Sequence, residues 1–220
     1  FNDAFTIEDI RAFDQRVKKI LGVAPTYAGE LKIDGFKIVL TYEKGLLVTA
    51  ATRGDGMVGE EVTANIRTVE SVPLRLTRDV SVMVEGEIWL GRKAFARLNI
   101  QRQKRGEPVF ANPRNAAAGT IRQLDPRIVA DRRLDSFIYD LAQADFPLPA
   151  TQFAELISLR ALGFKVNPHF RHCRGVDEVI SYWQEWQKQT GLLDYGLDGV
   201  VIKVNEREYQ ERLGYTGKAP

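Results

Sequence analysis

The sequence has little of the two residue types that build disulfides and zinc sites. Cys173 is its single cysteine, which excludes an internal disulfide and fits a reducing compartment. The two histidines, His169 and His172, lack the cysteine partners that a zinc site would need. We therefore predict no zinc site in this chain.

The sequence also lacks long apolar runs. No stretch approaches the ~20 apolar residues of a membrane-spanning helix, and the first residues do not resemble a signal peptide. With 44% hydrophobic and 27% charged residues among 220, the composition is typical of a soluble globular protein. We expect a cytoplasmic protein with one large domain or two small ones.

Negative charge is scarce in one segment, residues 92–133. This segment holds 11 Lys and Arg residues against 3 Asp and Glu residues, a net charge of +8, whereas the whole chain carries +2 and the remainder therefore −6. Such asymmetry predicts an anionic partner on one side of the molecule. A solvated helical face would account for part of the same excess, so both interpretations stay open.

The segment Glu-Leu-Lys-Ile-Asp-Gly at residues 30–35 carries the strongest chemical signal. Alternate side chains of an extended strand point to opposite faces, so Glu30, Lys32 and Asp34 are predicted to line one face. Leu31 and Ile33 would then anchor the other face in a core. A lysine held between two carboxylates is a candidate nucleophile, because the carboxylates can position its amine and accept its proton. An ordinary half-buried strand has the same pattern, so this segment alone does not decide.

Periodicity predicts a mixture of helices and strands. Thr6 and Asp9 form a helix-capping pair, and the helical spacing that follows ends at Gly22. The other expected helices cover residues 92–105, 151–162 and 176–189. The other expected strands cover residues 36–42 and 46–52, joined as a hairpin, and residues 80–90, 136–141, 165–173 and 197–204.

Polar residues outside the lysine strand also suit ligand binding. Arg53 precedes a tight Gly-Asp-Gly loop, where a phosphate or ribose contact and a plain surface position are equally compatible with the pattern. Gly86 separates two glutamates on a predicted strand, as happens where a ligand approaches the backbone closely. Lys203 interrupts the apolar strand 197–204, which is predicted to be buried, and a lysine there needs an anionic or hydrogen-bonding partner.

The order and spacing of these motifs resemble those of one family, the adenylation domain of bacterial NAD-dependent DNA ligases, over nearly the whole chain. Lys-Ile-Asp-Gly at residues 32–35 resembles the family's nucleophile motif, which ATP-dependent ligases and RNA-capping enzymes share. More specific are the motif blocks at residues 51–65, 112–125 and 198–204. Together they favour Lys32 as the nucleophile.

The resemblance implies an α+β nucleotidyltransferase fold, like that of DNA ligases and mRNA-capping enzymes, with antiparallel sheets flanked by helices and a nucleotide cleft. It implies an adenylation domain at residues 23–220 behind a helical lead-in at residues 1–22. The chain is expected to end before the last basic motif and the oligonucleotide-binding domain of such a ligase. Its implied partners are NAD, magnesium and nicked double-stranded DNA, and we expect a monomer in the bacterial cytoplasm, associated with the nucleoid.

The same resemblance implies roles for individual residues. Lys32 attacks the adenylyl phosphorus of NAD and keeps AMP, which passes to the 5′-phosphate of a nick before sealing. Asp34 and Asp198 act around the reacting phosphate, and Glu87 and Asp198 are candidates to hold magnesium. Tyr139 stacks on adenine, with Ile33 beneath the base. The residues implied to bind the adenosine part of NAD are Glu30, Arg53, Glu87 and Lys203, and those implied to be required for ligation are Arg114 and Arg122.

Four positions depart from the family pattern. Phe36 and Lys37 replace smaller or less polar residues that are common after the nucleophile motif. Gly196 stands where many members have an acidic residue, and Thr190 stands where a basic residue is usual. Within the basic segment, the cluster of Arg102, Lys104 and Arg105 is predicted to lie exposed at a helix end and to contact DNA phosphates.

Two other functions are compatible with parts of the sequence. One is a nucleotidyltransferase that uses ATP or GTP, against which the motif blocks around Arg53 and Arg114 argue. The other is a degenerate nucleotide- or DNA-binding module without turnover. Intact Lys32, Asp34 and Glu87 argue against such a module, as does Lys203.

Overall fold

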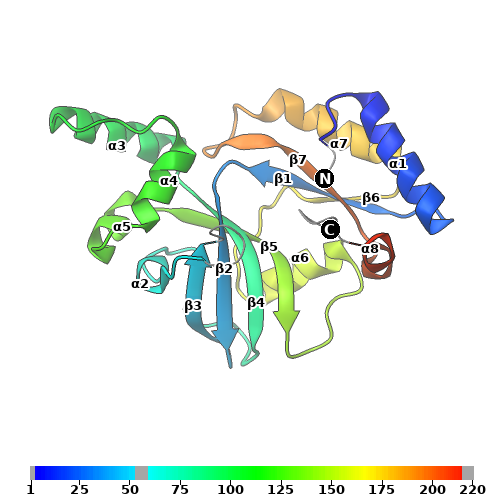
Figure 1. Cartoon of the computed structure of the whole chain (residues 1–220), viewed down its shortest axis with the longest axis horizontal. Helices are drawn as coiled ribbons and strands as arrows, with labels where there is room; N and C mark the ends of the chain where they lie inside the picture. The colour runs from blue at the N-terminus through cyan, green and yellow to red at the C-terminus, as the bar shows by residue number, and fades with distance from the viewer. Residues whose placement is uncertain (1–2, 53–58, 215–220) are drawn as a thin grey trace.

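The computed structural model describes residues 3–52 and 59–214. Figure 1 shows how its helices and strands are arranged. The strands are β1 (Tyr27–Ile33), β2 (Phe36–Glu43), β3 (Leu46–Thr52), β4 (Val82–Trp89), β5 (Asp135–Ala144), β6 (Arg171–Cys173) and β7 (Leu197–Val204). The helices are α1 (Ile7–Leu21), α2 (Thr63–Ile66), α3 (Arg92–Lys104), α4 (Pro113–Ile121), α5 (Pro126–Arg132), α6 (Gln152–Ala161), α7 (Val176–Gln189) and α8 (Arg207–Leu213).

Within the described ranges, the strands form two antiparallel sheets. The smaller sheet has the strand order β6-β1-β7, and the larger sheet has the order β3-β2-β4-β5. The chain crosses from the smaller sheet to the larger one between β1 and β2, at Asp34 and Gly35. The segment singled out in the sequence therefore lies where the two sheets meet (Figure 1). The predicted α+β class with antiparallel sheets flanked by helices is confirmed.

Local sequence signals explain several element boundaries. Thr6 caps α1 by accepting the N–H of Asp9, whose side chain bonds back to the cap backbone, and Gly22 ends the helix at φ 74°. The β2–β3 hairpin turns at Lys44 (φ 47°) and Gly45 (φ 77°). Positive φ at both turn residues matches the right-handed twist of the flanking strands. The capped helix and the hairpin were both predicted correctly.

Each sheet has its own apolar core. The core of the larger sheet includes side chains from α4, α5 and α6, such as Ala116, Val129 and Leu156. The core of the smaller sheet includes side chains from α1 and α7, and it also takes in Trp89 of β4 and Phe137 of β5. The two sheets are therefore joined through the ends of β4 and β5. Helix α7 packs in this second core through Val179, Ile180 and Trp186.

Two sequence-based expectations were wrong. The segment predicted as a strand over residues 165–173 is a strand only at Arg171–Cys173, because Pro168 lacks a backbone donor and the chain turns there. Strand β7 lies at a sheet edge with mostly half-buried side chains, rather than in a fully buried position.

Gly86 has a packing role in the larger sheet. A Cβ there would lie 2.4 Å from Ile138 and 2.6 Å from the Phe137 carbonyl. The glycine admits an irregular register between β4 and β5. A ligand close to its backbone stays a prediction.

Among the described residues, no helix combines the length and apolar character needed to cross a membrane.

Candidate active site

Lys32 lies at the end of β1 and faces the start of β7. Antiparallel pairing brings the two strands together, and the Lys32 ammonium bonds to the carboxylate of Asp198. The side chains of Lys32 and Asp198 are 43% and 58% exposed. The lysine is thus open to a ligand while its amine is held by a carboxylate that can accept a proton.

The side chains of the lysine strand differ in burial. Leu31 and Ile33 pack in the core of the smaller sheet, as predicted. Glu30 is only 7% exposed and lines a cavity, whereas the side chain of Lys32 is 43% exposed. The carboxylate of Glu30 therefore lies deeper in the molecule than the amine of Lys32.

Asp34 lies beside Lys32's strand at the crossing between the sheets. Its backbone N–H donates to the carbonyl of Gly196 at 2.9 Å, and its carboxylate lies 3.9 Å from the guanidinium of Arg114. Arg114 comes from the first turn of α4, which begins at Asn112 as a side-chain cap with Pro113 next. The structure therefore brings one of the two predicted ligation arginines to the lysine segment.

Two of the departures from the family pattern, Gly196 and Thr190, have structural correlates. A Cβ at Gly196 would lie 3.1 Å from the Asp34 Cβ and 3.4 Å from its carboxylate, so a larger residue there would crowd Asp34. The carbonyl of Thr190 accepts a hydrogen bond from the Arg92 guanidinium at 3.1 Å. A cation from another element therefore lies near the position where the family usually carries one.

Glu87 faces the same region from β4. Its burial raises the pKa of the carboxyl to about 7, and the charge of Asp34 adds to the rise. The cations Arg114, Lys32 and Lys37 oppose the shift without cancelling it. Lys37 pairs in register with Glu87 and forms an ion pair with Glu85. The carboxyl of Glu87 therefore changes charge near neutral pH.

A second cluster lies deeper, between β1, β5 and β7. Lys203 Nζ lies 3.1 Å from Glu30 Oε1, 3.4 Å from the Tyr139 carbonyl and 5.6 Å from the centre of the Tyr139 ring. The contact with Glu30 is an ion pair rather than a well-aligned hydrogen bond. The prediction that Lys203 needs an anionic partner is confirmed.

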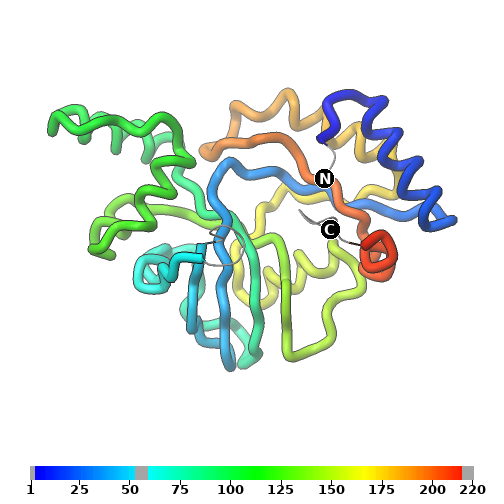
Figure 2. The backbone as a smooth tube through the Cα atoms, viewed as in Figure 1, coloured from blue at the N-terminus to red at the C-terminus, as the bar shows by residue number. Residues whose placement is uncertain are grey.

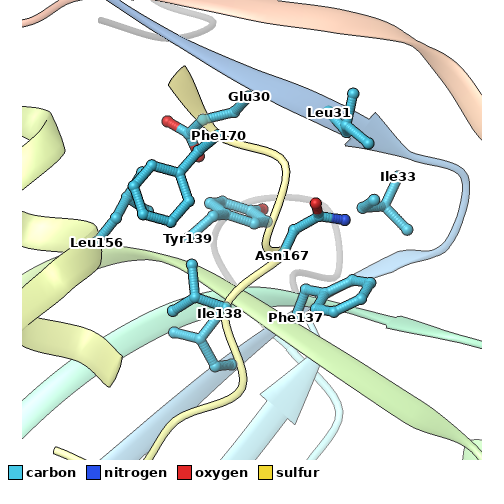
Figure 3. Close-up of a pocket in the computed structure, with 10 residues that line it drawn as sticks. Glu30, Leu31, Ile33, Phe137, Ile138, Tyr139, Leu156, Asn167 and Phe170 are labelled. Atoms are coloured by element: carbon cyan, nitrogen blue, oxygen red, sulfur yellow. The ribbon is translucent and has the colours of Figure 1, made fainter. Parts of the chain in front are cut away.

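The cavity next to this cluster is small and mostly apolar. Figure 3 shows Tyr139 between Glu30 of β1 and the loop that carries Asn167. The cavity measures about 20 Å³, which is room for about one water molecule. A purine ring would enter it only if the lining side chains move.

Sequence reasoning missed the residues that surround this cluster. Burial alone would lower the pKa of Lys203, but the carboxylates of Glu30 and Asp140 outweigh it and raise the pKa. Glu155 of α6, 1% exposed, accepts the Leu141 N–H at 2.9 Å and pairs with Arg207 of α8. These positions carry no motif, and only the packing of α6 and α8 against β5 and β7 brings them together.

The remaining predicted residues are not gathered here. Arg122 forms an ion pair with Glu60 at 2.5 Å and has no described contact with Lys32, Asp34 or Asp198. Arg53 lies outside the described residues. Within the described part of the chain, no group of three His, Cys, Asp or Glu side chains converges as a metal site. Magnesium contacts of Glu87 and Asp198 stay a prediction.

Comparison with known proteins shows to which family this chain belongs. Residues 1–220 match the model of the NAD-dependent DNA ligase adenylation domain family. The chain belongs to this family.

Curated members of known name are similar along the whole chain. The DNA ligase of Thermotoga maritima is 52% identical over 220 residues, covering 100% of this chain and 32% of the relative. The DNA ligase of Shouchella clausii is 47% identical over 219 residues, covering 100% of this chain and 33% of the relative. The chain therefore spans about a third of the length of the curated relatives it matches.

A solved structure of mycobacterial DNA ligase D complexed with ATP and MES aligns at a TM-score of 0.49 and 17% identity, covering 84% of this chain and 50% of that one. A similarity of this size bears on neither substrate nor mechanism.

Glu87 should make the stability of this adenylation domain depend on pH. Its pKa is raised to about 7 in the folded state, so the folded state binds a proton more tightly than the unfolded chain. The protonated Glu87 carboxyl therefore stabilises the folded state at low pH, and this stabilisation is lost as the pH rises through about 7. Between about pH 5 and pH 8, we expect Glu87 to cost about 1–3 kcal/mol, a cost absent from Glu87→Gln. Urea unfolding of the parent protein and of Glu87→Gln at these two pH values measures the cost. If the free energy of unfolding changes equally with pH in both proteins, the raised pKa of Glu87 is wrong.

Proposed function

We propose that this chain is the adenylation domain of an NAD-dependent DNA ligase, with Lys32 as the nucleophile. The observation that carries the proposal is the Lys32–Asp198 pair, an accessible amine beside a carboxylate in a chain of this family. Residues 23–220 would form the domain proper. Helix α1 would be a lead-in that packs on α7 and α8.

The proposed first step is a substitution at phosphorus. The Lys32 amine forms an N–P bond to the adenylyl phosphorus of NAD, and Asp198 accepts the proton that the amine loses. The bond between that phosphorus and the oxygen of nicotinamide mononucleotide breaks, and the mononucleotide leaves with the electron pair. Arg114, beside Asp34, would stabilise the charge that develops on the phosphate oxygens.

The deeper cluster is proposed to hold the adenosine part of NAD. Tyr139 offers a ring for stacking, with Ile33 on the other side of the base. Glu30 and Lys203 offer an acceptor and a donor for the edge of the adenine. Glu87 and Arg53 complete the proposed set. Because the cavity is small, binding would require Tyr139 or its neighbours to shift.

Later steps would seal a nick in double-stranded DNA. The AMP passes from Lys32 to the 5′-phosphate, and the 3′-hydroxyl of the neighbouring strand then displaces AMP and closes the backbone. Arg114 and Arg122 are the proposed contacts for these steps. Magnesium, when bound, supplies positive charge to the phosphates. Glu87 and Asp198 are the side chains proposed to contact the ion.

Incubation of the protein with NAD or ATP, each labelled in the adenylate, tests the proposal. We expect NAD to leave AMP bound to the denatured protein by an acid-labile, base-stable bond, with release of nicotinamide mononucleotide. Labelling by ATP alone would favour an ATP-using nucleotidyltransferase. Tight reversible binding with no covalent label from either nucleotide would favour a binding module instead.

A further inference from the structure

The exposed face of α3 carries cations that the fold leaves unneutralised. In the described part of the chain, no carboxylate lies within ion-pair distance of Lys93, Arg97, Lys104 or Arg105, and all four are exposed. Cations elsewhere commonly have a carboxylate partner, including Arg11, Lys18, Lys37, Arg75, Arg171 and Arg174. Because α3 itself contains no acidic residue, the charge of these four side chains faces solvent uncompensated.

These cations form a stripe along one side of the helix. At 3.6 residues per turn, Lys93, Arg97 and Lys104 fall within about 40° of one another around the axis. Lys93 and Lys104 are about 16 Å apart along it, at 1.5 Å per residue. Arg105 follows directly as the C-cap. We call Lys93, Arg97, Lys104 and Arg105 the α3 stripe.

The opposite side of α3 is firmly attached to the protein. Phe95 and Leu98 pack against the core of the larger sheet. Asn99 exchanges hydrogen bonds with the backbone of Phe110, at 2.9 and 3.0 Å. Figure 2 shows α3 and the returning chain projecting together from the rest of the fold. The stripe is therefore displayed by a supported helix rather than by a loose one.

Arg102 does not belong to this stripe, which corrects the predicted cluster. Its guanidinium donates to the Pro108 carbonyl at 2.6 Å, pairs with Glu107 at 2.9 Å and lies 4.7 Å from the centre of the Phe110 ring. Arg102 points to the supporting side and fastens the chain after α3. Lys104 and Arg105 remain exposed, as predicted.

We propose that the α3 stripe binds phosphates of double-stranded DNA beside the nick-sealing site. The inference rests on the proposed function, because it assigns a surface to the DNA partner of that function. A stripe of about 16 Å spans about five base pairs at 3.4 Å per pair, so one helix can meet several phosphates. Ile100 is the exposed large apolar residue of α3 and lies on the same side of the helix, between Arg97 and Lys104. A protein partner would need buried aromatic or apolar anchors, and a membrane would need an apolar face.

Phosphate contacts of this kind predict salt-dependent binding without sequence preference, because each contact releases counterions and reads no base. The stripe has no described contact with Lys32, Asp34, Glu87 or Lys203. Neutralising it should therefore weaken DNA binding and leave self-adenylation unchanged.

The test compares Arg97→Gln/Lys104→Gln with the matched control Lys19→Gln/Lys44→Gln. The control removes two exposed cations, on α1 and in the β2–β3 turn. Binding of a fluorescent nicked duplex is titrated between about 50 and 200 mM salt, and labelling by NAD is measured in parallel. We expect the α3 variant to bind roughly tenfold or more weakly and its log–log salt slope to fall by about two, at about 0.9 per lost contact. The control should retain the affinity and slope of the parent protein, and both variants should be labelled by NAD as fast as the parent.

Several results would overturn the assignment. One is an equal salt slope in the parent protein and the α3 variant. Another is an equal loss of affinity for the nicked duplex in the α3 variant and the control. If NAD labelling persists in these cases, the proposed adenylation stands and only the surface is wrong. If the parent protein binds the duplex without salt dependence, both the proposed surface and the proposed DNA partner are wrong. If the α3 variant loses binding to phosphatidylglycerol vesicles but keeps its affinity for DNA, the stripe is a membrane contact instead.

Discussion

Replacing Lys32 with alanine is expected to abolish covalent labelling by NAD, a loss of at least about 1,000-fold, because no other group can take over the attack on phosphorus. Lys32→Arg should lose labelling equally. Its guanidinium can keep the ion pair with Asp198 but stays protonated and is not nucleophilic. Intact-mass spectrometry after incubation with NAD measures the adduct. Calorimetry with AMP, which contains the adenosine part alone, should show that both variants still bind it.

Lys18→Ala is a matched control for this prediction. The Lys18 side chain is 41% exposed and pairs with Asp14, whereas that of Lys32 is 43% exposed and pairs with Asp198. The two lysines thus have similar exposure, and each pairs with an aspartate. Asp14 is buried but also accepts the Tyr27 hydroxyl at 2.7 Å, and Lys18 has no described contact with Lys32 or Asp198. An adduct of normal yield on Lys32→Ala would remove Lys32 as the nucleophile. Loss of the adduct in Lys18→Ala as well would show that the effect is not specific.

Replacing Arg207 with methionine is expected to destabilise the protein by about 3–5 kcal/mol, because it strands a buried carboxylate. Glu155 is 1% exposed, and Arg207 of α8 is its charged partner in the structure. Burial raises the pKa of Glu155 to about 7, so at low pH the stranded carboxyl can take up a proton and escape part of the cost. The destabilisation should therefore be larger near pH 8 than near pH 6. Denaturant unfolding at both pH values measures it.

An exposed ion pair provides the comparison. Arg11 and Asp177 join α1 to α7 with side chains 52% and 81% exposed, so Arg11→Met should cost at most about 1 kcal/mol. The double variant Glu155→Gln/Arg207→Met should recover much of the stability lost in Arg207→Met, because no charge is then left buried. Similar losses for Arg11→Met and Arg207→Met would contradict the importance of burial. A double variant no more stable than Arg207→Met would contradict the stranded charge as the cause.

The sequence by itself was sufficient for the local elements and for the family. The cap pair Thr6 and Asp9, the Lys44-Gly45 turn and the helical periodicities are decided by neighbouring residues, and the corresponding elements were predicted correctly. The order of the motif blocks also predicted the family, which the match over residues 1–220 confirms. The need of Lys203 for a partner followed from the cost of burying an ammonium in an apolar strand.

Only the tertiary structure decided which of these residues meet. It paired Lys32 with Asp198, brought Arg114 but not Arg122 to Asp34, and turned Arg102 inward while Lys104 stayed exposed. It also surrounded Lys203 with Glu30, Asp140 and Glu155, two of which belong to no motif. Such contacts depend on strand register, on the irregularities in β1 and β5, and on helix packing between segments far apart in the chain. Local composition and spacing do not encode those distances, because burial and charge act on a side chain only once its distant neighbours are in place.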